Sequence, residues 1–138
     1  KIRFRYAEIL YPELPEYEGK EGTLMLENIR AAMAQDIYIA KGGDETFKPF
    51  FTNHGYRYIE ISGIEEELPL DNVEGIVLSS IKGIDAKYET SSELVNKLWS
   101  NITWSTLGNF VSIPTDCQQR NERLGWAGDI AVCSRTAS

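Results

Sequence analysis

The sequence has little cysteine, little histidine and no metal-binding pattern. Its two cysteines, Cys117 and Cys133, are too few for a disulfide framework, and neither lies in a CxxC or mixed Cys/His motif. The single histidine, His54, excludes a site built from several imidazoles, and its place between Asn53 and Gly55 favours a turn over a catalytic position. We therefore expect no metal ion and no other cofactor.

Positive charge and long apolar runs are also missing. The net charge is -7, and lysine and arginine do not cluster, which argues against binding to nucleic acid or to an anionic membrane. No apolar stretch approaches the roughly 20 residues of a membrane-spanning helix. The opening residues, KIRFRYAEIL, lack the apolar block of a signal peptide. We expect neither nucleic acid nor a membrane as a partner.

The composition is that of a globular protein, and its first 88 residues read mainly as β-structure. Hydrophobic residues make up 42% of the chain and charged residues 25%, which suffices for a packed core. Short runs rich in Ile, Tyr and Phe, bounded by Gly, Asn or Asp, are typical of antiparallel strands. These runs are IRFRYAEI (2–9), DIYIAKGG (36–43), TFKPFFTNHG (46–55), YRYIEISG (56–63) and VEGIVLSSI (73–81). Residues 11–23 read as a surface loop, and residues 24–35 are compatible with either a helix or an extended connection.

The pattern changes to helical at about residue 89. Five residues recur at three- and four-residue steps, which predicts a helix of about five turns: Val95, Leu98, Trp99, Ile102 and Thr106. Ser91 or Ser92 is its expected N-cap, and Asp129 is the expected cap of a second helix starting at Ile130. The chain opens inside a strand pattern and stops just inside this second helix. We therefore expect an α+β segment that spans the end of a β domain and the start of a helical one, rather than a complete small protein.

The most informative stretch is TDCQQRNERLGWAGD, residues 115–129, which shows neither helical nor strand periodicity. Hydrolysis of a glycoside needs a carboxylic acid to protonate the leaving oxygen, groups that bind sugar hydroxyls, and often an aromatic wall for the apolar face of the sugar. This run holds acids, arginines and a tryptophan together. The residues alone also allow a structural interpretation, in which Glu122 pairs with an arginine, Asp129 caps a helix, Asp116 closes a turn and Trp126 fills a core.

The same run resembles the active-site stretch of bacterial α-L-rhamnosidases, glycoside hydrolase family 78, which reads close to DCPQRDERxGWxGD. In that family a concanavalin-like β-sandwich domain leads into a six-hairpin (α/α)6 catalytic barrel. The upstream runs RYAEIL, RAAMAQDIYIAKGG and PFFTNHGYRYIEISG are similar to its sandwich. The resemblance implies part of an antiparallel β-sandwich at 1–88 and the first helices of the barrel at 89–138.

The resemblance also implies roles for individual residues. Glu122 matches the general acid of an inverting enzyme that removes terminal α-L-rhamnose. Asp116 and Asp129 match acids that bind sugar hydroxyls, Trp126 matches an aromatic wall, and Arg120 would hold a hydroxyl or position Asp116. The general base of the family lies later in the barrel, beyond Ser138, so the fragment alone is expected to be inactive. Its expected partners are a rhamnose-containing oligosaccharide or glycoside and the remainder of the same barrel.

Two positions depart from the family pattern. Gln118 stands where proline is usual, and Asn121 stands where aspartate is usual, which removes a carboxylate next to the acid and puts substrate and rate in doubt. An alternative function is a non-catalytic carbohydrate-binding or structural β-module, with rings such as Tyr11, Tyr17 or Tyr56 forming a sugar platform. Periplasmic, extracellular and cytoplasmic locations in a bacterium all stay open.

Overall fold

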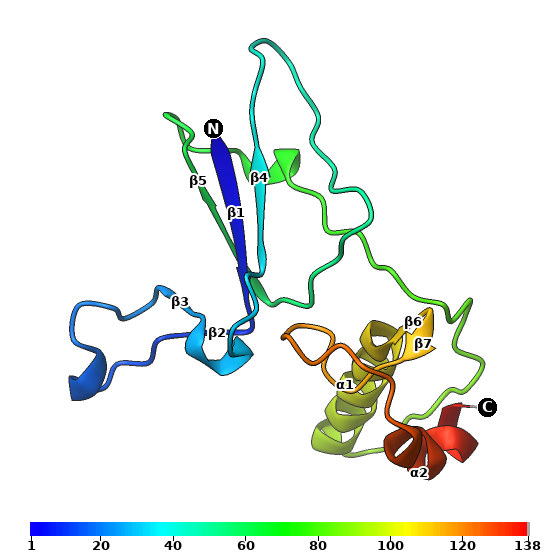
Figure 1. The fold of residues 1–138 in the computed structure, drawn as a ribbon. Helices are drawn as coiled ribbons and strands as arrows, with labels where there is room; N and C mark the ends of the chain where they lie inside the picture. The colour runs from blue at the N-terminus through cyan, green and yellow to red at the C-terminus, as the bar shows by residue number, and fades with distance from the viewer. Residues whose placement is uncertain (138) are drawn as a thin grey trace. The chain divides into compact units, whose positions relative to one another are not determined.

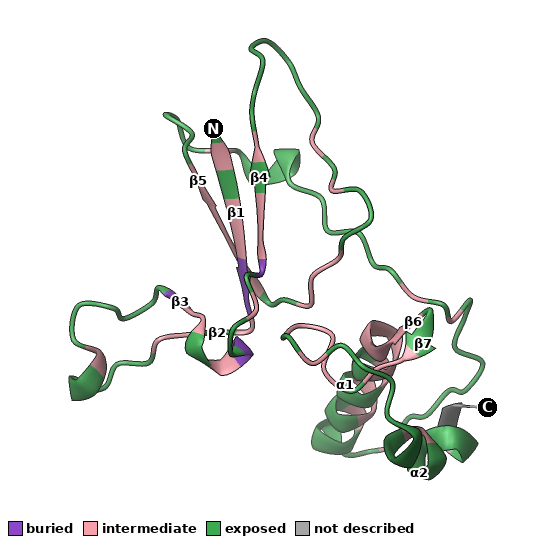
Figure 2. Cartoon of the chain, in the orientation of Figure 1, coloured by how far each residue is buried: buried purple, intermediate pink, exposed green. Residues whose placement is uncertain are grey.

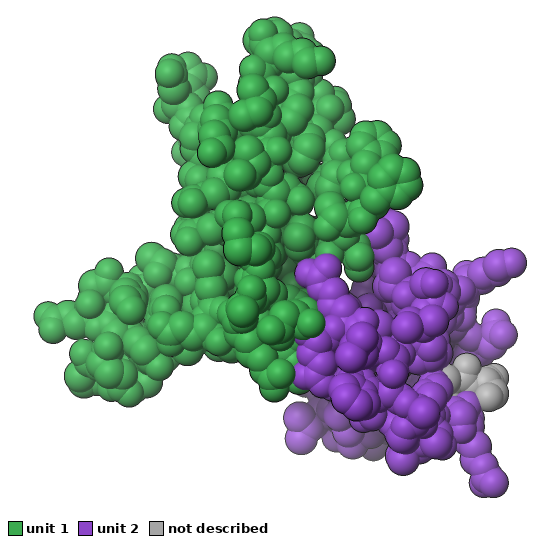
Figure 3. All heavy atoms as spheres, viewed as in Figure 1, with its two compact units in different colours: residues 1–75, 119–121 green, residues 76–118, 122–138 purple. Residues whose placement is uncertain are grey.

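A computed structural model describes residues 1–137, with the side chains of residues 1–135. The chain divides into two compact units, shown in different colours in Figure 3. The β unit comprises Lys1–Gly75 together with Gln119–Asn121, and the helical unit comprises the remaining segments, Ile76–Gln118 and Glu122–Ser138.

The β unit is built on a three-stranded antiparallel sheet. Strand β1 (Ile2–Ala7) lies between β4 (Gln35–Tyr38) and β5 (Tyr58–Ser62), so that the order is β4-β1-β5 (Figure 1). The register places Arg5 opposite Glu60, and the Arg5 guanidinium donates two hydrogen bonds of 2.8 Å to that carboxylate. The strands expected within 2–9, 36–43 and 56–63 are confirmed, with shorter bounds.

Short elements fill the segment that the sequence left open. Strand β2 (Ile9–Leu10) pairs with β3 (Leu24–Met25) and closes the expected surface loop between them. Residues 24–35 form neither a regular helix nor one continuous strand, and positive φ angles at Arg30 (57°) and Ala34 (38°) bend the backbone there. Three single 3-10 turns complete the unit, at Pro15–Tyr17, Glu27–Ile29 and Leu70–Asn72.

The core of the β unit is small and lies at the end of β1. Tyr6, Ile29 and Ala34 form one buried cluster, against which partly buried apolar side chains pack. Ala7 and Leu24 are also buried, and these five are the only buried side chains among residues 1–135 (Figure 2). Alternation along β1 explains why Tyr6 lies in this cluster and Phe4 packs against it, because these two residues share the face opposite Arg3 and Arg5.

Two expected strands are absent, at 46–55 and 73–81, so these two predictions were wrong. In the first segment only Phe47 and His54 stack on other rings, whereas Phe50 and Phe51 are exposed. The Phe47 ring stacks on Phe4 and on Tyr38, with centroids 5.1 and 4.7 Å apart, and Pro49 has no N–H for a ladder. Ile76, Val77 and Leu78 of the second segment pair with no strand in residues 1–137 and are 49%, 61% and 51% exposed. In both segments the residues typical of strands either pack their side chains or are exposed, and their backbones form no ladder.

The helical unit contains the predicted helix α1 (Glu93–Asn109), a tight hairpin of β6 (Phe110–Val111) and β7 (Ile113–Pro114), and α2 (Ala127–Ala137) (Figure 1). The fold class is confirmed, because the antiparallel sheet β4-β1-β5 precedes both helices along the chain. In residues 1–137 no helix is long and apolar enough to cross a membrane.

The expected N-cap position of α1 is confirmed, whereas the expected cap of α2 is not. Ser92 occupies the N-cap position of α1, but its side chain makes no capping bond. Asn96 reaches back instead, accepting a bond from the Thr90 backbone N–H at 2.8 Å and donating one to the Thr90 carbonyl at 2.9 Å. Helix α2 begins at Ala127, two residues before Asp129, so the prediction that Asp129 caps it was wrong. Asp129 lies in the first turn, where a carboxylate interacts favourably with the helix dipole.

Candidate functional site

The motif 115–129 starts at a point fixed by the end of α1. The Thr115 backbone N–H donates to the Asn109 carbonyl at 2.7 Å, and the Thr115 hydroxyl donates to Asn109 Oδ1 at 3.2 Å. The hairpin before it is also held, because the Ser80 N–H donates to the Phe110 carbonyl at 2.6 Å and the Ser112 N–H donates to Ser80 Oγ at 2.7 Å. These bonds attach the first residues of an irregular loop to regular structure.

Gly125 lets the same loop fold back over the hairpin. A Cβ at this position would lie 3.1 Å from both Ile113 Cδ1 and the Pro114 carbonyl oxygen, so a larger residue would crowd β7. Gly128 is under no such constraint, because nothing lies within 4 Å of a Cβ built there and its φ angle is not positive.

A hollow of about 870 Å³ lies in the helical unit, bordered by α1 and α2 and by the start of the motif. Its volume is within the range of about 300 to 1,000 Å³ that is common for small-molecule sites. The residues that line it are Asn101, Ile102, Ser105, Thr106, Asn109, Phe110, Pro114, Thr115, Asp116, Trp126, Gly128, Asp129, Ile130, Val132 and Cys133.

Three of the five expected site residues line this hollow: Asp116, Trp126 and Asp129. Asp116 lies two residues after the end of β7, and Trp126 directly precedes α2. The Trp126 carbonyl accepts the first backbone bond of that helix, from the Ile130 N–H at 3.1 Å. Trp126 is 44% exposed, which leaves its ring accessible. Two carboxylates and one accessible indole can bind adjacent hydroxyls and an apolar face of a sugar.

The other two expected residues do not line the hollow. Glu122 is half-buried in the helical unit, and Arg120 is half-buried in the β unit, to which residues 119–121 belong. Neither residue lies in a helix or strand, so their positions depend on the path of the loop.

Helix α1 also lines the hollow, which was not expected from the sequence. Asn101, Ser105 and Asn109 lie four residues apart and therefore share one side of the helix. The spacing of these polar residues could have indicated a polar side of α1. That this side lines a hollow is seen only once the motif and α2 are placed in the structure.

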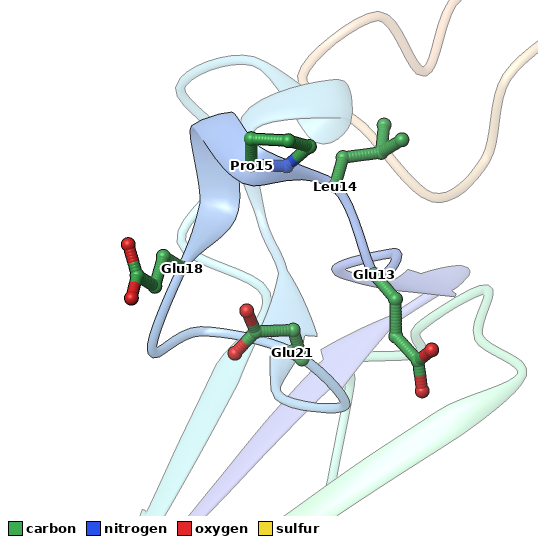
Figure 4. Close-up of a pocket in the computed structure, with 5 residues that line it drawn as sticks. All are labelled: Glu13, Leu14, Pro15, Glu18 and Glu21. Atoms are coloured by element: carbon green, nitrogen blue, oxygen red, sulfur yellow. The ribbon is translucent and has the colours of Figure 1, made fainter.

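A second hollow lies on the β unit and is lined by Glu13, Leu14, Pro15, Glu18 and Glu21 (Figure 4). Its carboxylates do not converge, because Glu18 points away from Glu13 and Glu21, and Glu21 Oε2 accepts a bond from the Gly19 N–H at 2.8 Å. In the described residues no group of three or more His, Cys, Asp or Glu side chains is arranged to hold a metal ion.

His54 belongs to a packed cluster in the β unit. Its ring stacks on Tyr6 with centroids 4.1 Å apart, and its Nε2 lies 3.0 Å from Asp36 Oδ2, which also accepts a bond of 2.9 Å from the Tyr6 hydroxyl. Burial raises the pKa of Tyr6 far above its usual range, and the bond to Asp36 adds to the effect. The cluster ties residue 54 to β1 and β4, which is a structural role.

The tyrosines considered as a sugar platform also pack against neighbours. Tyr11 and Tyr17 are half-buried, with ring centroids 5.0 Å apart, and the Tyr11 hydroxyl donates to Glu27. Tyr56 is 45% exposed, but its ring contacts Tyr6 at 5.1 Å. These contacts favour packing over an open platform.

Two domain families match consecutive parts of the chain. Residues 1–79 match the concanavalin-like domain of bacterial alpha-L-rhamnosidase, and residues 85–138 match the six-hairpin glycosidase domain of bacterial alpha-L-rhamnosidase. An alpha-L-rhamnosidase of Streptomyces avermitilis is 44% identical over 138 residues, which are 99% of this chain and 13% of that protein.

Solved structures agree with these matches. A crystal structure of Streptomyces avermitilis alpha-L-rhamnosidase complexed with L-rhamnose superposes with a TM-score of 0.89 at 43% identity, covering 99% of this chain and 12% of that one. The structure of alpha-L-rhamnosidase from Dictyoglumus thermophilum gives a TM-score of 0.88 at 42% identity, covering 99% and 15%. The chain thus corresponds to roughly an eighth of these relatives.

Proposed function

The chain belongs to the bacterial α-L-rhamnosidase family, and we propose that the complete protein carrying it is an inverting glycosidase that releases terminal α-L-rhamnose from rhamnosides. In this proposal residues 1–88 are part of the β-sandwich and residues 89–138 begin the catalytic barrel. The chain spans 13% of the Streptomyces avermitilis relative, so the activity belongs to the complete protein rather than to this segment.

Glu122 has the central chemical role in the proposal. As general acid it gives its proton to the glycosidic oxygen as the bond to the sugar breaks. A second carboxylate, roughly 6.5 to 9.5 Å away and outside this segment, activates the water that attacks the opposite face of the ring. Asp116 and Asp129 accept bonds from sugar hydroxyls, Trp126 covers the apolar face, and Arg120 holds a hydroxyl or positions Asp116.

The observation that best supports the proposal is the hollow in the helical unit. It brings together Asp116, Trp126 and Asp129, three residues that the motif assigns to sugar binding and that span 14 positions of the chain, 116–129. An alpha-L-rhamnosidase complexed with L-rhamnose has the same fold over this segment, which favours rhamnose as the sugar.

The decisive experiment substitutes Glu122→Gln in the complete protein. We expect a loss of about 10²- to 10⁴-fold in kcat on alkyl rhamnosides, the usual contribution of general acid catalysis. The loss should be much smaller on a dinitrophenyl rhamnoside, whose leaving group needs no proton. Binding of L-rhamnose, measured by calorimetry, should be retained.

Two controls accompany this experiment. Glu89→Gln removes an exposed carboxylate of the same unit and should leave turnover unchanged. Proton NMR of the first product should show β-L-rhamnose, as inversion requires. Near-normal turnover of alkyl rhamnosides by the Glu122→Gln enzyme would refute the role of Glu122, and initial release of the α-anomer would refute inversion.

A further inference from the structure

Glu8 connects strands β1 and β2, next to the buried residue Ala7. It follows Ala7, the last residue of β1, which is 1% exposed and whose carbonyl accepts a bond of 2.9 Å from the Arg57 N–H. It precedes Ile9, the first residue of β2. Its backbone is therefore fixed on both sides, and its half-buried carboxylate has a defined position.

Two amide side chains donate to the same oxygen of this carboxylate. Gln119 Nε2 lies 3.1 Å from Glu8 Oε2, and Asn28 Nδ2 lies 3.4 Å from it. Asn28 is itself adjacent to Ile29, the most deeply buried large side chain. Gln119 comes from a position 111 residues further along the chain, inside the motif. Hydrogen bonds to an ionised acceptor are stronger than those between neutral groups.

The bond lies within the β unit, to which residues 119–121 belong although the residues on both sides of them belong to the helical unit. The loop from Asp116 to Trp126 has no helix or strand of its own. Glu122 follows Gln119 by three residues, so at most about 11 Å of extended chain separates the two. Fixing Gln119 therefore restricts where the Glu122 carboxyl can lie.

We propose that Glu8 is a positioning residue for the acid-bearing loop: by accepting the amide of Gln119, the β unit holds the segment that leads into Glu122. The inference rests on the proposed role of Glu122 as general acid. It assigns to the β unit a part in catalysis, although Glu8 touches neither the sugar nor the bond that breaks. A displacement of about 1 Å can lower a rate by about 10²-fold, so loss of the anchor should affect turnover.

The test exchanges the two partners in the complete protein. Gln119→Glu places two carboxylates against each other, and we expect kcat on alkyl rhamnosides to fall by about 10- to 100-fold. The double variant Glu8→Gln with Gln119→Glu recreates the bond with its direction reversed, because the new amide at position 8 can donate to the new carboxylate. We expect it to recover at least half of the lost activity on a logarithmic scale.

A purely structural role would give a different set of results. The positioning role predicts that Gln119→Glu lowers kcat with little change in KM and spares a dinitrophenyl rhamnoside. The matched control Glu16→Gln, which removes an exposed acid of the same unit, should have no effect. Absence of rescue in the double variant, or an equal loss on both substrates, would overturn the proposal.

Failure of the positioning role of Glu8 can be distinguished from failure of the proposed role of Glu122. If Glu122→Gln abolishes turnover of alkyl rhamnosides while the exchange shows no rescue, only the positioning role fails. If Glu122→Gln retains turnover, the acid assignment fails, and the positioning role fails with it.

Discussion

The two units of the chain differ in the side chains that they bury and in the expected site residues that they contain. The β unit holds all five buried side chains among residues 1–135, and it holds the His54–Asp36–Tyr6 cluster and the Arg5–Glu60 pair. The helical unit has no buried side chain in its described part, and it contains four of the five expected site residues. Buried apolar area is the main source of folding free energy, so the β unit should carry most of the measurable stability of this chain.

The helical unit differs in having its apolar side chains exposed. Leu94, Leu98 and Trp104 on α1 are 80%, 56% and 58% exposed, and Val132 on α2 is 84% exposed. An amphipathic helix gains most of its stability by burying its apolar side. The bonds between Thr115 and Asn109 hold the start of the motif although these apolar side chains of α1 are exposed.

The largest effect should come from the core of the β unit. Ile29 is 1% exposed, and Ile29→Ala should lower the free energy of unfolding by about 2 to 5 kcal/mol, because it removes buried methyl groups and leaves a cavity. Val132→Ala in the helical unit should change it by less than about 0.5 kcal/mol. Urea unfolding of the chain, followed by circular dichroism, measures both. Equal losses would break the contrast between the units.

A smaller effect is expected from the polar cluster around Asp36. The side chains of His54 and Asp36 are 9% and 13% exposed, and Asp36→Ala would deprive both His54 and Tyr6 of their acceptor. Unfulfilled buried donors cost about 1 to 3 kcal/mol, which we expect as the loss in unfolding free energy. Asp85→Ala removes an exposed acid of the helical unit and is the matched comparison. If both variants unfolded at the same urea concentration, the cluster would have no stabilising role.

The smallest effect should come from the Arg5–Glu60 pair and should depend on pH. The Arg5 guanidinium, through its hydrogen bonds, holds the pKa of the Glu60 carboxyl below its usual range. A lowered pKa means that the stabilisation is fully present at neutral pH and is lost as the pH falls below about 4 and through the folded-state value. Both side chains are about a third exposed, so the contribution is on the order of 0.5 to 1 kcal/mol.

Glu60→Gln tests this expectation. Its destabilisation, measured by thermal unfolding at pH 7, should disappear near pH 3, whereas Glu89→Gln in the helical unit should show no such dependence. A loss for Glu60→Gln that is constant between pH 7 and pH 3 would show that shape, rather than charge, matters at position 60.

Local periodicity was sufficient to predict strand β1 and helix α1. The alternation in β1 and the three- and four-residue steps of α1 predicted both elements, because one side of each had to be apolar. The same reasoning failed at 46–55, where a β-rich composition packs Phe47 onto other rings without forming a ladder. Composition indicates what a segment can bury, but not which partner it meets.

For this protein the sequence by itself determined the β-then-α order, the family and the residues of the motif, because these depend on local patterns and on residue identity. Only the tertiary structure decided that Asp116, Trp126 and Asp129 share one hollow with α1, and that Gln119 is bound by Glu8. The physical reason is distance along the chain. A contact between residues 111 positions apart depends on how the intervening segments fold, and no local pattern encodes it.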